Sequence, residues 1–177
     1  FSALPMAERL CGWERPGTRT VILHPGSKGS AVEWGLVNFA ALIRILNDGP
    51  FTVIVTGTEA EAAHYRRTLP LDGANTIDAG GAVDLTELIG LIGASDALVA
   101  ASTGPLHIAA ACGIRAIGVF SPRRPIHPGR WAPIGRDAHA LVFDPQCTTC
   151  AAGKPCDCVQ RISPQRVAEL LYALPVH

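Results

Sequence analysis

Long apolar runs and a leader-like N-terminus are both missing from this 177-residue sequence. A helix needs roughly 18 uninterrupted apolar residues to cross a bilayer, and no stretch of the chain reaches that length. Residues 1–13 also lack the ordered basic, apolar and small-residue segments of a signal peptide. We therefore expect a soluble protein of the cytoplasm with no transmembrane segment.

The sequence has no excess of charge of either sign, because 15 basic residues balance 15 acidic ones. Proteins that bind nucleic acid by neutralising its phosphates carry a basic field, so nucleic acid is not an expected partner. Charged residues make up 17% of the chain and apolar residues 48%, which is enough to bury a core. The length is that of one domain.

Regular periodicity is absent from residues 1–18, where prolines and glycines interrupt every short pattern, and the first residue is Phe rather than Met. We expect this segment to be the remnant of a linker cut from something longer, and residues 19–177 to form the domain. A fragment of this kind can carry a binding site while part of the chemistry stays on a missing partner domain.

Beyond residue 18, short runs rich in Val and Ile alternate with segments whose apolar residues recur at spacings of three and four, which are typical of buried parallel strands and amphipathic helices. Strands are predicted at residues 20–23, 51–55, 97–100 and 116–120, with shorter ones near 75–77 and 140–143. Helices are predicted at residues 36–46, 59–69, 84–92, 105–112 and 164–174. The alternation predicts an α/β fold with a doubly wound, Rossmann-like sheet of six parallel strands.

Ligands of such sheets bind beyond the carboxyl ends of the strands. The loops that follow Leu23, Val55, Ala100 and Phe120 are therefore the places where a site is expected.

The loop after Ala100 has the composition of a diphosphate site. It leads through Ser102, Thr103 and Gly104 into a predicted helix, whose dipole and unpaired first-turn amides attract anions. Pro105 suits the first turn because no N–H is needed there, and Gly104 has no side chain to keep an anion away. A well-capped helix without a ligand is the other interpretation of these residues.

Two residues of the same predicted helix extend this hypothesis. The backbone amides of Leu106 and His107 are expected to be free for a phosphate, and the His107 side chain is expected to donate to a phosphate oxygen. The alternative is that His107 is a hydrogen-bonded core residue, as a lone histidine on an apolar helix often is.

The loop after Leu23 supplies a cation. Ser27 and Lys28 lie between Gly26 and Gly29, and the ammonium group can neutralise a diphosphate that leaves when a sugar is transferred. A surface lysine on a flexible loop is the alternative. The glycine spacing is not that of a P-loop, which excludes an ATPase of that class.

The loop after Val55 carries two carboxylates at the start of the next predicted helix. Glu61 either compensates the helix dipole or accepts a ribose hydroxyl, and Glu59 is the second candidate for the ribose. Spacing alone does not choose between these roles.

The loop at residues 121–135 is basic and aromatic. It carries Arg123, Arg124, His127, Arg130 and Trp131. These side chains suit contacts with a nucleobase, a diphosphate or an anionic lipid-linked acceptor, and the alternative is a solvated connection.

Four of the six cysteines gather within residues 147–158, an insertion between the last predicted strand and the last helix. Cys147, Cys150, Cys156 and Cys158 follow the pattern C-x2-C-x5-C-x-C, whereas Cys11 and Cys112 stand alone. Four thiols this close suit a tetrahedral zinc site or, less readily, an iron–sulfur cluster, but the spacing to the second pair is shorter than in common zinc ribbons. Disulfides and free thiols also stay open.

Three of these loops, taken in order, resemble glycosyltransferase family 9, which contains the ADP-heptose:lipopolysaccharide heptosyltransferases. The resemblance rests on His-Pro-Gly-Ser from His24 with Trp34 ten residues later, on Thr-Gly-Thr-Glu-Ala-Glu from Thr56, and on Ser-Thr-Gly-Pro-Leu-His-Ile-Ala-Ala-Ala from Ser102. It covers residues 21–171 but corresponds only to the C-terminal domain of such enzymes, which have two Rossmann-like domains of the GT-B type.

The resemblance implies an inverting hexosyl or heptosyl transfer from a nucleotide sugar, ADP-heptose or a similar donor, with no metal required. The implied donor contacts are Ser27, Lys28, Glu61, Ser102, Thr103, Gly104 and His107. The implied acceptor is a lipid-linked saccharide of lipopolysaccharide or related glycan assembly, which places the enzyme at the periphery of the inner membrane. The catalytic base belongs in that family to the N-terminal domain, so this fragment is expected to bind donor and transfer little or nothing.

Two positions depart from the family pattern. Many relatives have Asp where this chain has Ser102, and a basic residue directly before Trp34, where this chain has Val32 and Glu33. Lys28 then has to replace the missing cation from another point of the loop, so a different nucleotide sugar stays open. Two alternatives to a transferase also remain: a free-standing nucleotide-binding module, and a metal-stabilised interaction platform built on the cysteines.

Overall fold

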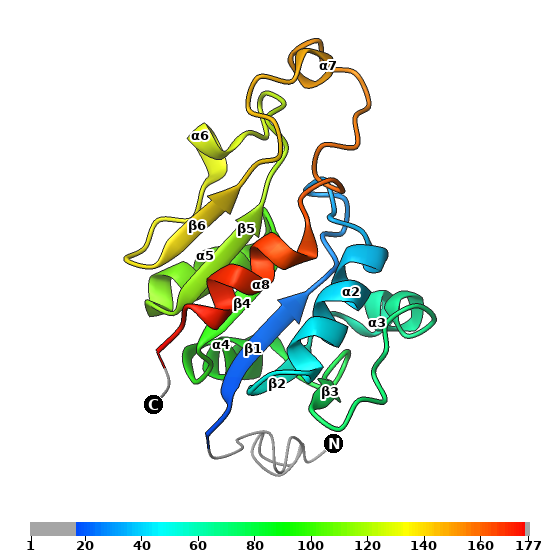
Figure 1. Ribbon diagram of the computed structural model, residues 1–177, viewed down its shortest axis with the longest axis vertical. Coiled ribbons are helices and arrows are strands. Elements are labelled where there is room, and N and C mark those ends of the chain that lie inside the picture. The colour runs from blue at the N-terminus through cyan, green and yellow to red at the C-terminus, as the bar shows by residue number, and fades with distance from the viewer. Residues whose placement is uncertain (1–16, 176–177) are drawn as a thin grey trace.

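Six short apolar segments pair into one parallel sheet in the computed structural model, which describes residues 17–175 (Figure 1). The strands are β1 (Arg19–His24), β2 (Phe51–Val55), β3 (Thr76–Asp78), β4 (Ala97–Ala101), β5 (Arg115–Val119) and β6 (Ala138–Leu141). Their order is β3-β2-β1-β4-β5-β6, so β1 and β4 lie at the centre and the chain crosses the sheet after β3. This is the order of a doubly wound Rossmann-like sheet, which confirms the predicted fold class.

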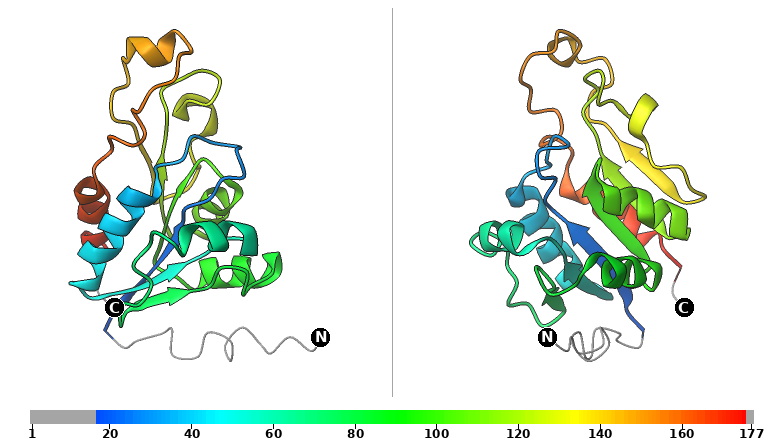
Figure 2. Two further views of the ribbon diagram at one scale, coloured as in Figure 1. Left: turned by 90° about the vertical axis from the view of Figure 1, so that its right-hand side faces the viewer. Right: turned by 180° about the vertical axis from the view of Figure 1, so that it is seen from behind.

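Helices cover both faces of the sheet (Figure 2). They are α2 (Leu36–Asn47), α3 (Glu59–Tyr65), α4 (Leu85–Gly93), α5 (Gly104–Cys112), α6 (Pro128–Trp131), α7 (Thr148–Ala151) and α8 (Pro164–Tyr172). The cluster of buried residues on one face takes side chains from α2, α3 and α8, and the cluster on the other face takes them from α4 and α5. No helix among residues 17–175 is long and apolar enough to cross a membrane.

Local signals explain where several helices begin and end. Thr58 forms a capping box with Glu61 at the start of α3, and Asp84 forms one with Glu87 at the start of α4. Gly113 has φ 80° and ends α5 in the left-handed conformation that favours glycine.

Several predicted boundaries are wrong and two helices were not predicted. The helix predicted to reach residue 69 ends at Tyr65, the helix predicted to reach residue 174 ends at Tyr172, and the strand predicted near residues 140–143 lies at Ala138–Leu141. The four-residue helices α6 and α7 are too short to show a period in the sequence. Most of the expected linker, and Cys11 within it, lies outside the described residues.

Candidate functional site

Two clefts open at the carboxyl edge of the sheet and meet at the start of α5. The first, here called the β1 cleft, has a volume of about 550 Å³ and lies among the loops after β1 and β2 and the first residues of α5. The second, the β5 cleft, has a volume of about 420 Å³ and lies between the start of α5 and the loop after β5. Both are lined by Ser30, Thr103 and Gly104.

The seven donor contacts that the resemblance implies all line one cleft or the other. Those in the β1 cleft are Ser27, Lys28, Glu61, Thr103 and Gly104, and those in the β5 cleft are Ser102, Thr103, Gly104 and His107. The four loops expected to carry a site all contribute: those after β1, β2 and β4 to the β1 cleft, and those after β1, β4 and β5 to the β5 cleft.

The loop after β1 is held in shape by Glu33. Its carboxylate accepts hydrogen bonds from the Ser27 amide (2.9 Å) and the Ser27 hydroxyl (2.8 Å), and Ser27 is buried. Lys28 has φ 50°, is exposed and lines the β1 cleft. Glu33 stands where many relatives have a basic residue. In this chain its carboxylate fixes the loop that carries Lys28.

The start of α5 is open, but one expectation about its amides is wrong. The Leu106 amide donates to the Thr103 carbonyl (3.1 Å), because the first turn closes with an i to i+3 bond, and it is not free. Thr103 makes no side-chain cap, and an added Cβ on Gly104 would meet no atom within 4 Å. Gly104 is exposed and opens the helix, so its amide is a backbone donor that the site can offer to an anion.

His107 belongs to the wall of the β5 cleft and is only half-buried. Arg130 and Trp131, both exposed, line the same cleft from α6. The loop after β5 therefore contributes Arg130 and Trp131 to the β5 cleft, whereas its other predicted contacts, Arg123, Arg124 and His127, do not line it.

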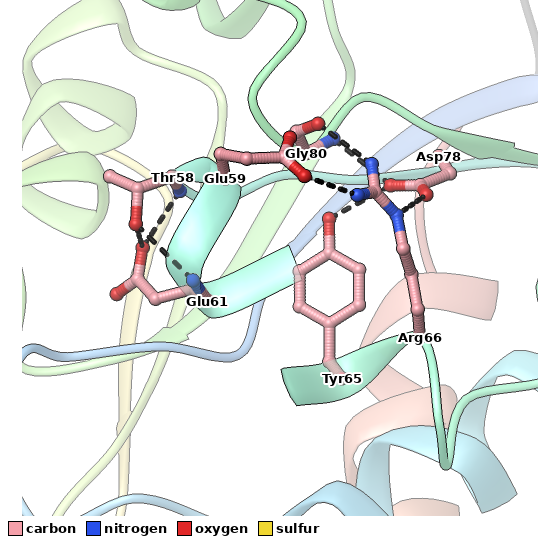
Figure 3. Close-up of polar contacts among 7 residues, drawn as sticks. All are labelled: Thr58, Glu59, Glu61, Tyr65, Arg66, Asp78 and Gly80. Carbon is pink, nitrogen blue, oxygen red and sulfur yellow. Dashed lines mark hydrogen bonds and ion pairs between the residues drawn. The ribbon is translucent and has the colours of Figure 1, made fainter. Parts of the chain in front are cut away.

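The two candidate carboxylates at α3 point in different directions (Figure 3). Glu61 lines the β1 cleft, and its Oε2 accepts hydrogen bonds from the Thr58 amide (2.8 Å) and hydroxyl (2.7 Å). Glu59 is paired instead with Arg66 at 2.9 Å, on the surface. Only Glu61 is placed for a ligand of the cleft.

Glu61 keeps its charge in this position. Burial raises the pKa of its carboxyl group, but the hydrogen bonds from Thr58, with smaller effects of His24 and Lys28, bring the pKa below its usual value. A Cβ at Gly26 would collide with Glu61 Oε1, so the glycine at this position lets the carboxylate reach the cleft.

His24 is a residue of the site that the sequence did not single out. It ends β1, is 9% exposed, and its Nδ1 lies 2.9 Å from the buried Thr56 hydroxyl. Burial lowers the pKa of His24; Glu61 opposes this shift and Lys28 adds to it. A neutral ring therefore forms part of the floor of the β1 cleft.

The sequence model of glycosyltransferase family 9 (heptosyltransferase) matches residues 8–159. The chain belongs to glycosyltransferase family 9. A provisionally named glycosyltransferase of Haemophilus influenzae is 32% identical over 130 residues, which are 71% of this chain and 37% of that protein.

Solved structures of heptosyltransferases share the fold. The E. coli ADP-heptose lps heptosyltransferase II superposes with a TM-score of 0.74 at 21% identity, over 95% of this chain and 49% of that one. E. coli heptosyltransferase WaaC with ADP gives 0.71 at 13% identity, over 94% and 48%. The same enzyme with ADP-2-deoxy-2-fluoro heptose gives 0.68 at 12% identity, over 94% and 47%. This family 9 chain thus spans about half the length of the solved relatives.

Four thiols of this family 9 chain converge outside the clefts. The sulfurs of Cys147, Cys150, Cys156 and Cys158 all lie within 4.8 Å of one another, and all four cysteines are free. Such a group can hold a metal ion. The short spacing between the two pairs, which argued against a metal in the sequence, does not keep the four sulfurs apart.

Proposed function

We propose that this domain holds the nucleotide-sugar donor of a glycosyl transfer, with the diphosphate between Lys28 and the start of α5. What carries the proposal is the geometry of the β1 cleft, where an exposed ammonium group and an open helix start border the same space. A diphosphate is the ligand class that needs both a cation and backbone donors. Relatives solved with ADP and with an ADP-sugar analogue support the same class of ligand.

The two clefts divide the donor between them in this proposal. Val83, Leu85 and Leu88 give the β1 cleft an apolar wall that suits a nucleobase. Glu61, charged and aimed into the same cleft, is our candidate for the ribose hydroxyls. The sugar then extends past Gly104 into the β5 cleft, whose walls include Ser102 and His107.

The reaction that follows is a displacement with inversion. An acceptor hydroxyl oxygen bonds to the anomeric carbon, the bond from that carbon to the phosphate oxygen breaks, and the nucleoside diphosphate leaves. Lys28 and the α5 dipole stabilise the charge that develops on the leaving group, so no metal is needed for this step.

The proton of the acceptor hydroxyl needs a base, and none of the described residues that line the β5 cleft is a carboxylate. We assign the base to a part of the enzyme outside this domain. The lipid-linked saccharide of lipopolysaccharide or related glycan assembly, reached at the cytoplasmic face of the membrane, is the proposed acceptor class.

Calorimetry with ADP, UDP and GDP tests the proposal directly. We expect micromolar to millimolar binding of one nucleotide, selectivity among the three bases, and no sugar transfer by this chain alone with any donor. Failure of all three nucleotides to bind would overturn the donor site. Measurable transfer by the isolated chain would overturn the assignment of the base to another domain.

Lys28→Met is expected to weaken nucleotide diphosphate binding by tenfold or more, because a charge-assisted bond to phosphate contributes roughly 1.5–3 kcal/mol. Lys154→Met is the matched control, since Lys28 and Lys154 are the two lysines of the chain and Lys154 lines neither cleft. Calorimetry measures the nucleotide diphosphate affinity of the two variants, and equal affinities would remove Lys28 from the site. The nucleoside without phosphates should bind equally well to Lys28→Met and to Lys154→Met.

A further inference from the structure

The cysteine insertion has almost no apolar material with which to hold itself together. Between Asp144 and Asp157 there is no Val, Leu, Ile, Met or aromatic residue, and residues 151–155 are exposed. Cys150 and Cys158 are nevertheless 2% exposed, so thiols form the interior of this segment. The segment rises from the carboxyl edge of the sheet with α7 at its tip (Figures 1 and 2). A loop of this kind needs a cross-link or a metal in place of a core.

We propose that Cys147, Cys150, Cys156 and Cys158 hold a structural zinc ion that ties this insertion to the walls of both clefts. Zinc bound to four thiolates is tetrahedral with Zn–S bonds of about 2.3 Å, a geometry that places the sulfurs about 3.8 Å apart. The Cys147 and Cys156 sulfurs are 3.7 Å apart, those of Cys156 and Cys158 are 3.2 Å apart, and every pair lies within 4.8 Å. Four soft sulfur donors select zinc over harder divalent ions.

The backbone explains how so uneven a spacing yields a compact group. Cys147 precedes the single turn of α7 and Cys150 is its third residue, a spacing of three that puts both side chains on one face of the turn. Gly153 follows with φ 70°, and the next residues bring the sulfurs of Cys156 and Cys158 back beside those of Cys147 and Cys150.

One side of the thiol group leads to the β1 cleft. After Cys158 the chain buries Val159 and Ile162, and the Gln160 side chain donates to the Glu33 carbonyl (3.0 Å). The carboxylate of Glu33 in turn holds the loop that presents Lys28. An ion that anchors Cys158 therefore also restricts the position of that loop.

The other side leads to the β5 cleft. The Cys150 sulfur lies 3.9 Å from the Ser121 hydroxyl, and Ser121 is a buried residue of the wall of that cleft. The ion is thus placed to fix the distance between the loop after β1 and the loop after β5. Ser30, in the first of these loops, lines both clefts.

Metal analysis of the purified chain tests the site without any assay of activity. We expect one zinc per chain by mass spectrometry. The double variant Cys147→Ser/Cys156→Ser should lose it, and Cys112→Ser, which removes an exposed thiol of α5 outside the group, should keep it. A stoichiometric iron–sulfur chromophore, or no metal with four thiols oxidised to two disulfides, would overturn the proposal. So would a metal-free, folded chain in which the four thiols of the group titrate as free thiols together with those of Cys11 and Cys112, six in all.

Cobalt keeps the proposal testable if the double variant does not fold. Refolding the unaltered chain with Co²⁺ should give the visible spectrum of a tetrahedral tetrathiolate complex, and added Zn²⁺ should bleach it because zinc binds thiolates more tightly. Loading should also release protons from the thiols, which calorimetry in two buffers detects. A six-coordinate, nearly colourless cobalt spectrum would count against the four-sulfur site.

The effect on the clefts rests on the proposed function, and a separate measurement isolates it. Removing the zinc should lower ADP affinity at least tenfold, while Cys112→Ser leaves it unchanged. A zinc-free chain that binds ADP as well as the loaded chain would overturn the tie to the clefts and leave the donor site standing. A zinc-loaded chain that binds no nucleotide would overturn the donor site and leave the zinc standing.

Discussion

Trp34→Ala is expected to lower the free energy of unfolding by about 3–5 kcal/mol, the cost of truncating a fully buried aromatic side chain. Trp34 is 0% exposed and packs edge to face against Phe39, with ring centroids 5.0 Å apart. Its Nε1 donates to the Ile162 carbonyl at 2.8 Å. Alanine leaves a cavity where α2 meets the segment before α8, and it also leaves that buried carbonyl without its partner.

Urea denaturation followed by circular dichroism measures this loss, and two further variants separate its causes. Trp34→Phe keeps most of the volume and removes only the hydrogen bond, so a loss of about 1–3 kcal/mol is expected. Trp131→Ala is the matched control, because Trp131 is 45% exposed and its removal should change stability by about 0.5 kcal/mol or less. If Trp34→Ala were as stable as the control, the packing of the 159–162 segment on α2 would not hold in solution.

The sheet could be predicted because its signals are local. The run at residues 51–55 is apolar at every position except Thr52, is bounded by Pro50 and Gly57, and forms β2 without a shift of boundary. A buried central strand of this kind can be identified from its own residues, without knowing which strands pair with it.

Boundaries failed where distant residues decide them. Val142 and Phe143 have the character of a strand, yet the register of β6 pairs Ala138 with Ala116 and ends with Leu141 opposite Val119. The chain therefore leaves the sheet before those two residues. At α3 the helix ends at Tyr65, and the Thr68 and Leu69 amides close a turn on the Tyr65 carbonyl. At this end the Arg66 side chain bonds to Asp78 and to the Gly80 carbonyl, neither of which is near it in sequence (Figure 3).

The site could be predicted in its location but not in its hydrogen bonds. Loops after parallel strands gather at one edge for reasons of topology alone, so the sequence suffices to bring Lys28, Glu61 and Gly104 together. That Glu33 takes up both donors of Ser27 depends on the fold of the intervening turn. From the sequence, Glu33 shows only that the basic residue of the family pattern is missing. In the folded loop its carboxylate is the hydrogen-bond acceptor for Ser27.

Gly104→Val is expected to weaken nucleotide diphosphate binding by about tenfold to a hundredfold, while the melting temperature stays close to that of the unaltered chain. Gly104 is exposed and lines both clefts, and a Cβ added to it would have no neighbouring atom within 4 Å. Because a Cβ at this position has open space around it, we expect the fold to tolerate valine, whose side chain fills the space in which a diphosphate has to approach the first amide of α5. Loss of the bonds to that amide and of contact with Lys28, roughly 1.5–3 kcal/mol in all, gives the expected range.

Gly93→Val is the matched control for this variant. Gly93 is the last residue of α4, outside both clefts, and a Cβ there would make only an ordinary contact with the Cys112 sulfur at 3.8 Å. Calorimetry with ADP and a thermal melt should show unchanged binding for Gly93→Val and lost binding for Gly104→Val, both folded. Because the two substitutions add the same atoms, only their positions differ. ADP binding by Gly104→Val at the strength of the control would mean that no phosphate lies against the start of α5.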